Sequence, residues 1–311
     1  MLKSEIRKAY LLDKYVIITP GRAKRPRDLK EQTVIKRESP CVLCPEKIEN
    51  YAKEHKDYIK EKINKNNKWQ VLSVANVFPA VTLDNKKAYG AQEVIIETRD
   101  HDKDLANLSN QEIEWVLRMY ARRTKALSQE KEIDYVLCFK NQGSKAGASI
   151  VHAHSQVFAT KILPPEVNQE LSAAQSYQVK HAKCAYCDII KKEAKSRRLI
   201  YEDKYVVAFT PYASEYHYEA WIFTKRHLDN ITMLNNKEFR ALANVYKLIL
   251  NKLSALDLSF NCFLHQVISN RDQHFYLKIQ PRDSVWAGVE LGSSMIINSV
   301  PPEEAAKYYR E

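Results

Sequence analysis

The stretch that decides the fold is Ser149-Ile150-Val151-His152-Ala153-His154-Ser155-Gln156. If this stretch is a β-strand, successive side chains alternate between its two faces, so His152, His154 and Gln156 lie on one face. Imidazole and amide groups need a hydrogen-bond partner or a ligand when they are buried. The pattern therefore predicts a functional strand, and the alternative is two histidines that are merely hydrogen-bonded within the fold.

The segment before this strand, residues 141–149 (Asn-Gln-Gly-Ser-Lys-Ala-Gly-Ala-Ser), is rich in small and hydrogen-bonding residues in a chain with only 6 glycines. Backbone N–H groups in such a loop can approach an anion closely, because few side chains stand in the way. A loop of this kind beside the histidine strand favours the functional interpretation.

Length and composition limit the class of protein. The 311 residues suffice for one large domain or for two of about 150 residues each. No apolar run approaches the roughly 18 residues that indicate a membrane span. The segment from Met1 to Tyr10 is charged and lacks the apolar core of a secretory signal, so we expect a cytoplasmic protein.

The net charge of +11 permits nucleic acid, a membrane surface or a phosphorylated substrate as a partner. Most of the lysines are interspersed with acidic residues, for example between Lys53 and Lys68, which is typical of a solvated surface. The densest basic stretch, residues 21–27, follows a predicted strand at residues 15–19. We therefore expect no membrane contact and give a phosphorylated small molecule priority over nucleic acid.

An internal duplication organises the rest of the chain. Residues 93–101 (Glu-Val-Ile-Ile-Glu-Thr-Arg-Asp-His) align without gaps on residues 219–227 (Glu-Ala-Trp-Ile-Phe-Thr-Lys-Arg-His). A second histidine follows the first after 51 residues in one half (101 to 152) and after 47 in the other (227 to 274). Several matches in register indicate two related α+β domains, which we place at residues 1–165 and 166–311.

The expected elements follow the same order in both halves. A capping box at Ser109 and Glu112 predicts a helix to about residue 129, and apolar spacing predicts another at about 237–256. Further helices are expected at about 166–180 and from Pro301 onward. Strands are expected at residues 69–75, 92–98, 133–140, 204–210, 219–224, 260–267 and 274–280.

Four of the six cysteines form two C-x-x-C pairs, which in a cytoplasmic chain indicate zinc rather than a disulfide. Each pair combines with the two duplicated histidines of its half. The first set is Cys41, Cys44, His101 and His152; the second is Cys184, Cys187, His227 and His274. Two cysteines and two histidines form a closed tetrahedral site, so we predict two structural zinc ions per chain. Cys138 and Cys262 lie in apolar runs and are predicted to be core residues.

If His152 binds zinc, His154 remains available for chemistry two residues away. A neutral imidazole can attack phosphorus and form a phosphoramidate, which splits one displacement into two steps and gives ping-pong kinetics. In the second half, Tyr276 and Lys278 stand where His154 and Gln156 stand in the first. We therefore expect the chemistry in the first half and a supporting role for the second.

Several motifs resemble one known family. They are Arg22-Ala23-Lys24-Arg25-Pro26, Cys41-Val42-Leu43-Cys44-Pro45, Asn76-Val77-Phe78-Pro79-Ala80, residues 93–101, residues 141–156 and Glu290-Leu291-Gly292. Together they resemble the galactose-1-phosphate uridylyltransferase branch of the histidine-triad superfamily, which also contains ADP-glucose phosphorylase. That branch has H-P-H-G/S-Q where this chain has His152 to Gln156. The resemblance covers nearly the whole chain.

The resemblance implies a fold and a set of roles. It implies two tandem histidine-triad-like domains, each an antiparallel sheet with a packed helix, and a homodimer in which the second domain reaches the neighbour's active site. It implies that His154 is the nucleophile and becomes nucleotidylated. The residues implied to contact the phosphates are Gln156, Ser149 and Asn141; those implied to lie near the nucleotide are Arg22, Arg25, Asn76 and Phe78. Ala153 departs from the usual Pro, and Tyr276 replaces a second-domain His on which a further metal would depend.

The expected function is nucleotidyl transfer from a nucleotide sugar, first of all UMP transfer between UDP-glucose and galactose 1-phosphate. Phosphorolysis of an ADP-sugar or of a dinucleoside polyphosphate is the alternative within the same chemistry. A nucleic-acid-binding histidine-triad protein is a third hypothesis, suggested by the net charge of +11, and a purely structural zinc protein is a fourth. The sugar-contacting positions of the family have no clear counterparts in this chain, so the sugar stays open.

Overall fold

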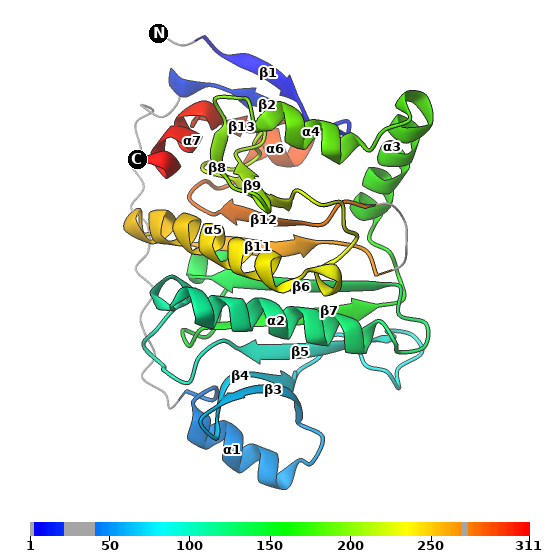
Figure 1. The fold of residues 1–311 in the computed structure, drawn as a ribbon, viewed down its shortest axis with the longest axis vertical. Coiled ribbons are helices and arrows are strands. Elements are labelled where there is room, and N and C mark those ends of the chain that lie inside the picture. The colour runs from blue at the N-terminus through cyan, green and yellow to red at the C-terminus, as the bar shows by residue number, and fades with distance from the viewer. Residues whose placement is uncertain (1–2, 22–40, 269–272) are drawn as a thin grey trace.

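A computed structural model of the chain describes residues 3–21, 41–268 and 273–311 (Figure 1). Within these residues the strands form a ten-stranded antiparallel sheet and a separate three-stranded sheet. The strands of the large sheet are β3 (Ile59–Lys65), β4 (Lys68–Ala75), β5 (Gly90–Ile96), β6 (Tyr135–Gln142), β7 (His154–Thr160), β8 (Leu199–Glu202), β9 (Val206–Phe209), β10 (Ala220–Thr224), β11 (Phe260–His265) and β12 (Tyr276–Pro281). The helices are α1 (Pro45–Glu54), α2 (Asn110–Leu127), α3 (Pro165–His181), α4 (Ala185–Glu193), α5 (Asn236–Ala255), α6 (Gly288–Ser293) and α7 (Pro302–Arg310).

The large sheet consists of two similar halves joined edge to edge. Its strand order is β3-β4-β5-β7-β6-β11-β12-β10-β9-β8, so the five strands on either side of the β6–β11 seam come from opposite halves of the chain. At the seam, Phe260 pairs with Gln142 and Phe263 with Phe139. The arrangement agrees with the duplication read from the sequence, and the α+β prediction is confirmed.

Helices α2 and α5 pack against each other and cover one face of the large sheet (Figure 1). The predicted capping box at the start of α2 is present, because Ser109 Oγ accepts the Glu112 N–H at 3.2 Å and Glu112 Oε2 accepts the Ser109 N–H at 2.7 Å. Asn235 and Glu238 form the equivalent box on α5. Both helices contribute to one hydrophobic core that extends across the seam.

The small sheet joins the chain's beginning to its end. Strand β2 (Tyr15–Ile18) lies between β1 (Glu5–Lys8) and β13 (Ile296–Asn298), antiparallel to the first and parallel to the second. The predicted boundary at residue 165 coincides with the start of α3 and stays a prediction. Strands β1 and β2, however, lie with the C-terminal half, because β13 and α7 supply their partners.

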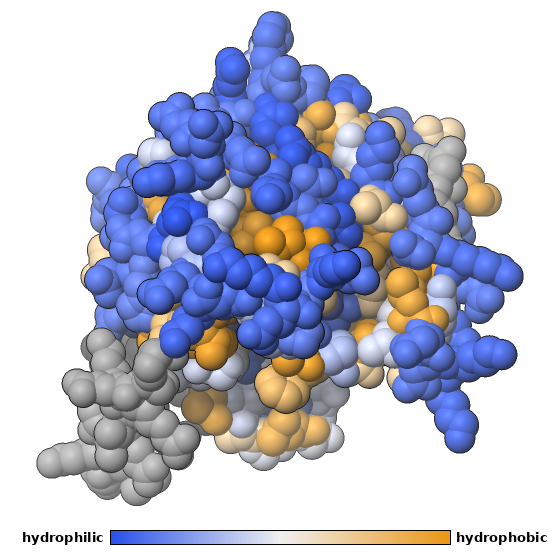
Figure 2. All heavy atoms as spheres, turned by 90° about the horizontal axis from the view of Figure 1, so that it is seen from below, coloured by the Kyte–Doolittle hydropathy of each residue, from blue (hydrophilic) through white to orange (hydrophobic). Residues whose placement is uncertain are grey.

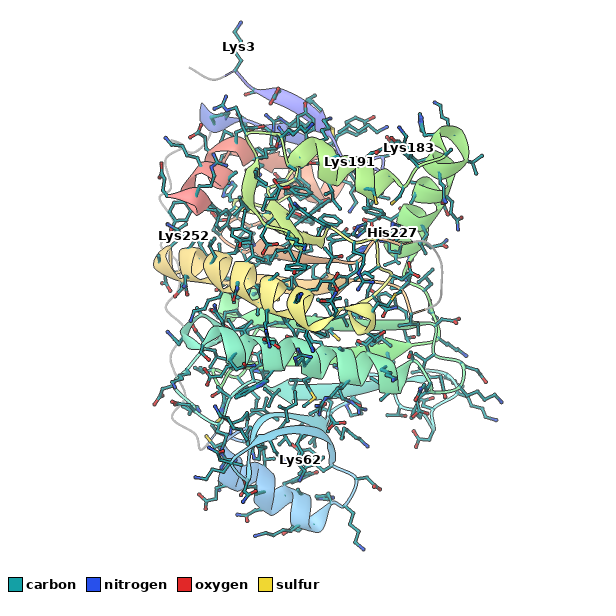
Figure 3. The ribbon with its side chains drawn as sticks, viewed as in Figure 1. Lys3, Lys62, Lys183, Lys191, His227 and Lys252 are labelled. Carbon is teal, nitrogen blue, oxygen red and sulfur yellow. The ribbon has the colours of Figure 1, made fainter. Side chains whose placement is uncertain are left out.

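The sequence prediction was wrong about the bounds of one strand and did not include another. The histidine strand β7 begins at His154, and residues 149–153 are not a strand, because the chain turns there to carry His152 into a cluster of cysteine and histidine side chains. The lysine-rich segment at residues 53–68 contains edge strand β3, which sequence reasoning did not predict. This end of the molecule is largely hydrophilic (Figure 2), and Lys62 of β3 is labelled there in Figure 3.

The described helices include none that is both long and apolar enough to cross a membrane.

Candidate functional site

His154 lies on the face of β7 opposite the helices, at the first position of the strand. Val157 and Ala159 point toward the α2 side and belong to the main core, so His154 and Gln156 point the other way. Its ring is held by a 2.8 Å contact between Nδ1 and the His152 carbonyl oxygen. A carbonyl can only accept, so Nδ1 carries the proton and Nε2 keeps its lone pair.

The electrostatics of the site favour the neutral imidazole. Burial is the largest cause that lowers the pKa of His154, and the positive charge of Lys140 lowers it further; the hydrogen bond to the His152 carbonyl opposes both. The group is therefore uncharged at neutral pH, and its Nε2 can act as a nucleophile.

A buried ion pair supports the histidine from the neighbouring strand. Lys140 Nζ on β6 donates to the His154 carbonyl oxygen at 3.0 Å and to Glu97 Oε2 at 2.7 Å. The exposed fractions of the two side chains are 1% and 0%. Sequence reasoning did not select either residue; the available signal was one lysine within the otherwise uncharged strand at residues 135–142.

The loop before β7 has the conformation that its glycines allow. Gly143 and Gly147 have φ angles of +80° and +84°, which favour glycine, and a Cβ on Gly143 would lie 2.3 Å from Ser259 Oγ. Asn261 Nδ2 on β11 donates to Asn141 Oδ1 and to the Ala146 carbonyl, each at 2.8 Å. The second half of the chain therefore holds the loop of the first half, with Ser149 exposed at its end.

A second segment, residues 76–80, lies beside β5, the strand that pairs with β7. Asn76 follows β4, and its Oδ1 accepts the N–H of Phe78 at 2.9 Å. Phe78 has 90% of its surface exposed, which suits a side chain that packs against a ligand. The segment is tied to Gln92 on β5, and Gln92 Nε2 donates to Gln156 Oε1 at 2.9 Å. The predicted positions Arg22 and Arg25 lie outside the described residues.

The first predicted metal set is brought together completely. The ligand atoms of Cys41, Cys44, His101 and His152 all lie within 4.8 Å of one another. Cys44 Sγ is 3.6 Å from His101 Nδ1 and 3.8 Å from His152 Nδ1. Tetrahedral zinc, with its usual bond lengths, needs sulfur-to-nitrogen separations of about 3.5 Å. His152 Nε2 donates to the Thr98 carbonyl at 2.9 Å, which leaves Nδ1 for a metal, so the residues fit zinc.

The second predicted set is brought together in part. Cys184, Cys187 and His227 have ligand atoms within 4.8 Å of one another, but His274 is not among them. The His274 ring lies 4.9 Å from that of His227, between centroids, and its buried Nε2 has no hydrogen-bond partner within the described residues. His227, which follows β10, is labelled in Figure 3.

The thiols of the second set also suit a metal. A hydrogen bond from Cys187 is the largest cause that lowers the pKa of Cys184, to about 4, and the same pairing raises the pKa of Cys187. The pair therefore holds one thiolate at neutral pH, and the thiolate is the form that binds metal.

The position equivalent to His154 in the second half is occupied by Tyr276, which lines a cavity together with Lys278 and Trp221. Tyr276 is completely buried and stacks on His265 and Phe223, with ring centroids 4.6 and 4.5 Å apart. The Lys278 ammonium lies 5.3 Å from the centre of the Trp221 ring. Neither side chain offers an imidazole lone pair to a substrate.

Comparison with known proteins identifies the family. The model of the galactose-1-phosphate uridyl transferase N-terminal domain matches residues 1–164, and that of a domain of unknown function, DUF4921, matches residues 90–308. ADP-glucose phosphorylase of Arabidopsis thaliana is 30% identical, with 99% of this chain and 92% of that protein covered. Galactose-1-phosphate uridylyltransferase of Thermotoga maritima is 27% identical, with 99% and 98% covered.

Solved structures agree with this assignment. The ADP-glucose phosphorylase of Arabidopsis thaliana with bound ADP-glucose has a TM-score of 0.86 and 28% identity, covering 99% of each chain. A uridylyltransferase structure has a TM-score of 0.76 and 28% identity, covering 99% of this chain and 98% of the other. The resemblance found in the sequence is confirmed: the chain belongs to the galactose-1-phosphate uridylyltransferase family and is a nucleotidyltransferase.

Proposed function

We propose that the protein transfers UMP between UDP-glucose and galactose 1-phosphate through a covalent uridylyl group on His154. The observation that carries the proposal is the geometry of this histidine: Nδ1 is fixed on the His152 carbonyl at 2.8 Å, so Nε2 of the neutral ring keeps its lone pair. Seven of the relatives compared are galactose-1-phosphate uridylyltransferases, which favours uridine and galactose.

The proposed reaction has two balanced steps. The Nε2 lone pair attacks the α-phosphorus of UDP-glucose, the bond to the bridging oxygen breaks, and glucose 1-phosphate leaves with that electron pair. A phosphate oxygen of galactose 1-phosphate then attacks the uridylyl phosphorus, and Nε2 leaves with its lone pair restored. The same nitrogen is nucleophile and leaving group, so the kinetics are ping-pong.

We propose that the surrounding residues bind and orient the substrate. Gln156 and Ser149 donate to phosphate oxygens, and Asn141 helps to hold them. Asn76 and Phe78 line the nucleoside side, and Arg22 and Arg25 are proposed to neutralise phosphate charge. Catalysis of this kind depends on positioning and charge neutralisation rather than on further covalent chemistry.

We propose that the two cysteine–histidine clusters hold structural zinc ions, with His274 as the fourth ligand of the second. A closed set of four protein ligands leaves no position for substrate, so the ion supplies folding energy and not chemistry. The first ion fixes His152, whose carbonyl in turn orients His154. The second half then only scaffolds, because Tyr276 and Lys278 replace the reactive pair.

We also propose a cytoplasmic homodimer. Helix α6 contains the Glu290-Leu291-Gly292 motif, and the segment around it exposes 93% of Val285 and 72% of Leu291. Exposed apolar side chains of this size, gathered in one segment, favour a protein partner. A second copy of this chain is the proposed partner, and nucleic acid is not.

Phosphorolysis of ADP-glucose is the second candidate function. It is favoured by the 30% identity and the TM-score of 0.86 to ADP-glucose phosphorylase. The first step is the same with AMP in place of UMP, and inorganic phosphate replaces galactose 1-phosphate in the second step, which gives ADP.

Product analysis separates the two candidates. The protein is incubated with UDP-glucose and galactose 1-phosphate, and in parallel with ADP-glucose and inorganic phosphate. Formation of UDP-galactose and glucose 1-phosphate supports the first candidate; formation of ADP and glucose 1-phosphate supports the second. No product in either mixture, with His154→Ala as the blank, would reject both.

A further inference from the structure

Gln92 on β5 makes three hydrogen bonds that connect two parts of the proposed active site. Its backbone carbonyl accepts the N–H of Asn76 at 3.0 Å, and its side-chain Oε1 accepts the N–H of Ala80 at 2.9 Å. Its Nε2 donates to Gln156 Oε1 at 2.9 Å. One residue therefore holds both ends of the 76–80 segment and also contacts Gln156 on β7.

The direction of these hydrogen bonds is fixed by the backbone. The Ala80 N–H can only donate, so the Gln92 atom that faces it must be the carbonyl oxygen. The Gln92 NH₂ group then faces Gln156, and the Gln156 atom that meets it must be the amide oxygen. The Gln156 NH₂ group is consequently turned away from Gln92.

This orientation matters for a phosphate ligand. Phosphate oxygens only accept hydrogen bonds, so a glutamine that binds them must present its NH₂ group. An isolated amide can rotate by about 180° and present either end, because the two ends have nearly the same shape. Gln92 removes this freedom: with Ala80 as the fixed donor, only one orientation of Gln156 keeps both hydrogen bonds.

We propose that Gln92 is a positioning residue that sets the amide of Gln156 for phosphate and couples it to the segment carrying Asn76 and Phe78. The proposal rests on the nucleotidyl-transfer function proposed above, and deepens it. When a nucleoside contacts the 76–80 segment, Ala80 keeps Gln92 oriented, and Gln92 keeps the Gln156 NH₂ group available. Gln92 contacts no reacting atom and acts through Gln156 alone.

The decisive variant is Gln92→Glu, which has nearly the same shape but only accepting oxygens. Its carboxylate keeps the hydrogen bond from Ala80, so the 76–80 segment stays tethered. It must also accept from Gln156, so the Gln156 amide rotates and presents its oxygen to the phosphate. We expect the rate of adduct formation at saturating nucleotide sugar to fall about 10- to 100-fold, the scale of a lost hydrogen bond to a charged group.

Gln92→Met distinguishes polarity from packing. Methionine has a similar length but no hydrogen bond, so Gln156 becomes free to rotate rather than held in the wrong orientation. We therefore expect Gln92→Met to lose less activity than Gln92→Glu. A merely structural role gives the opposite order, because glutamate keeps the Ala80 hydrogen bond that methionine loses.

A double variant completes the test. In a Gln156→Ala background, Gln92→Glu should cause no further loss, since its effect passes through Gln156. Gln111→Glu is the matched control, because it makes the same change on the exposed start of α2 and should leave the rate unchanged. Additive losses in the double variant, or Gln92→Met slower than Gln92→Glu, would overturn the proposal.

The outcome also separates this proposal from the function itself. A wild-type protein that forms no adduct with either nucleotide sugar refutes the proposed function. A wild-type protein that forms an adduct, with Gln92→Glu as fast as wild type, refutes only the role of Gln92. If Gln92→Glu does not fold, Gln92→Met is instead measured in the wild-type and Gln156→Ala backgrounds. Equal losses in the rate of adduct formation in both backgrounds refute the proposal.

Discussion

His154 owes its chemical state to three neighbours: the carbonyl of His152, the ammonium of Lys140 and the surrounding buried groups. The carbonyl selects the tautomer by accepting from Nδ1 at 2.8 Å. Burial, and then the charge of Lys140, lower the pKa. Together these effects give one neutral ring with one available lone pair, which is what an attack on phosphorus needs.

The rate of adduct formation should therefore persist into mildly acidic solution. A lowered pKa means that the ring becomes protonated only below its ordinary value of about 6.5, and only the neutral ring attacks. We expect a constant rate at saturating nucleotide sugar from neutral pH down to below about 6.5, and a fall only at lower pH. Rapid-quench measurement of the rate of adduct formation across pH provides the test. If the rate is half-maximal at a pH above the ordinary histidine pKa of about 6.5, the environment raises the pKa of His154 and the prediction is wrong.

Removing one partner of the Lys140–Glu97 pair should lower the free energy of unfolding, whereas replacing both partners with apolar residues should lower it much less. Lys140→Met leaves the Glu97 carboxylate buried without its cation, which should lower the free energy of unfolding by about 3–5 kcal/mol. Lys140→Met combined with Glu97→Leu removes both charges and should recover most of that loss. Urea unfolding of both variants tests this, with Lys225→Met as control, because its pair with Glu202 is one-third exposed and contributes little. A double variant less stable than the single one would contradict this account.

At the level of elements, what the sequence could predict depended on local pattern. Strands β5 and β10 and helices α2 and α5 were predicted because each has its own periodicity or capping box, and because the duplication shows each pattern twice. A strand was predicted at residues 15–19, where β2 lies, but the three-stranded sheet was missed. Its other strands, β1 and β13, have only 4 and 3 residues, and β13 pairs with β2 from the other end of the chain. Edge strand β3 was missed because its lysines match a solvated surface, which is also how proteins protect sheet edges.

The residues of the candidate site likewise fall into those that local sequence patterns predict and those that they do not. The zinc ligands were predictable from spacing, since C-x-x-C and a following histidine are local signals. Gln92, Lys140 and Asn261 were not, because their roles arise from contacts across strands and across the seam. The fourth ligand of the second cluster, His274, was predicted by analogy with His152, and the described geometry places it next to the other three rather than among them.

One ion-pair network joins helix α7 to the N-terminal strand. Glu303 accepts from Arg7 at 3.0 and 3.1 Å and from Arg198 at 2.8 Å. Burial, the largest single cause, raises the pKa of Glu303, but the hydrogen bonds from Arg7 and Arg198 together outweigh it, so the pKa is lowered. Glu303 therefore stabilises the fold in its charged form.

Glu303→Gln should destabilise the protein at neutral pH by about 2 kcal/mol, the scale of hydrogen bonds to a charged group. Because the pKa in the folded state is depressed, this contribution is complete above the unfolded value of about 4.3 and is lost as pH falls through the folded value. Denaturant midpoints of wild type and variant should thus converge in acid. A difference that is the same at neutral and acidic pH would contradict the ionic origin.

On the scale of the whole molecule, the second half of the chain is joined to the first, and we propose that it stabilises the first rather than duplicating its chemistry. The seam between β6 and β11 makes the two sheets continuous, and Asn261 reaches across it to hold Asn141 and the loop before His154. Meanwhile Tyr276 and Lys278 stand at the equivalent positions of the second half, where they line a cavity. The duplicated fold thus has an imidazole at this position in one half and a phenol in the other.

The duplication also predicts the metal content. Protein prepared without chelator should contain two zinc ions per chain, and His152→Ala should lose one of them and become less stable, because closed zinc sites contribute to folding. His154→Ala should keep both ions, since His154 is not a ligand in this scheme. Elemental analysis of the three proteins provides the measurement; one zinc in the wild type would reject the second site, and loss of zinc from His154→Ala would exchange the roles of the two histidines.

The central claim is that His154 carries the nucleotidyl group, and the mass of the intact protein tests it most directly. After mixing with UDP-glucose alone or ADP-glucose alone, without acceptor, the wild type should gain the mass of one nucleotidyl group per chain. The adduct should map to His154, and its mass names the nucleotide. His154→Ala, folded and zinc-loaded, should gain nothing. No mass gain with either nucleotide sugar, or the same gain in His154→Ala, would contradict the account.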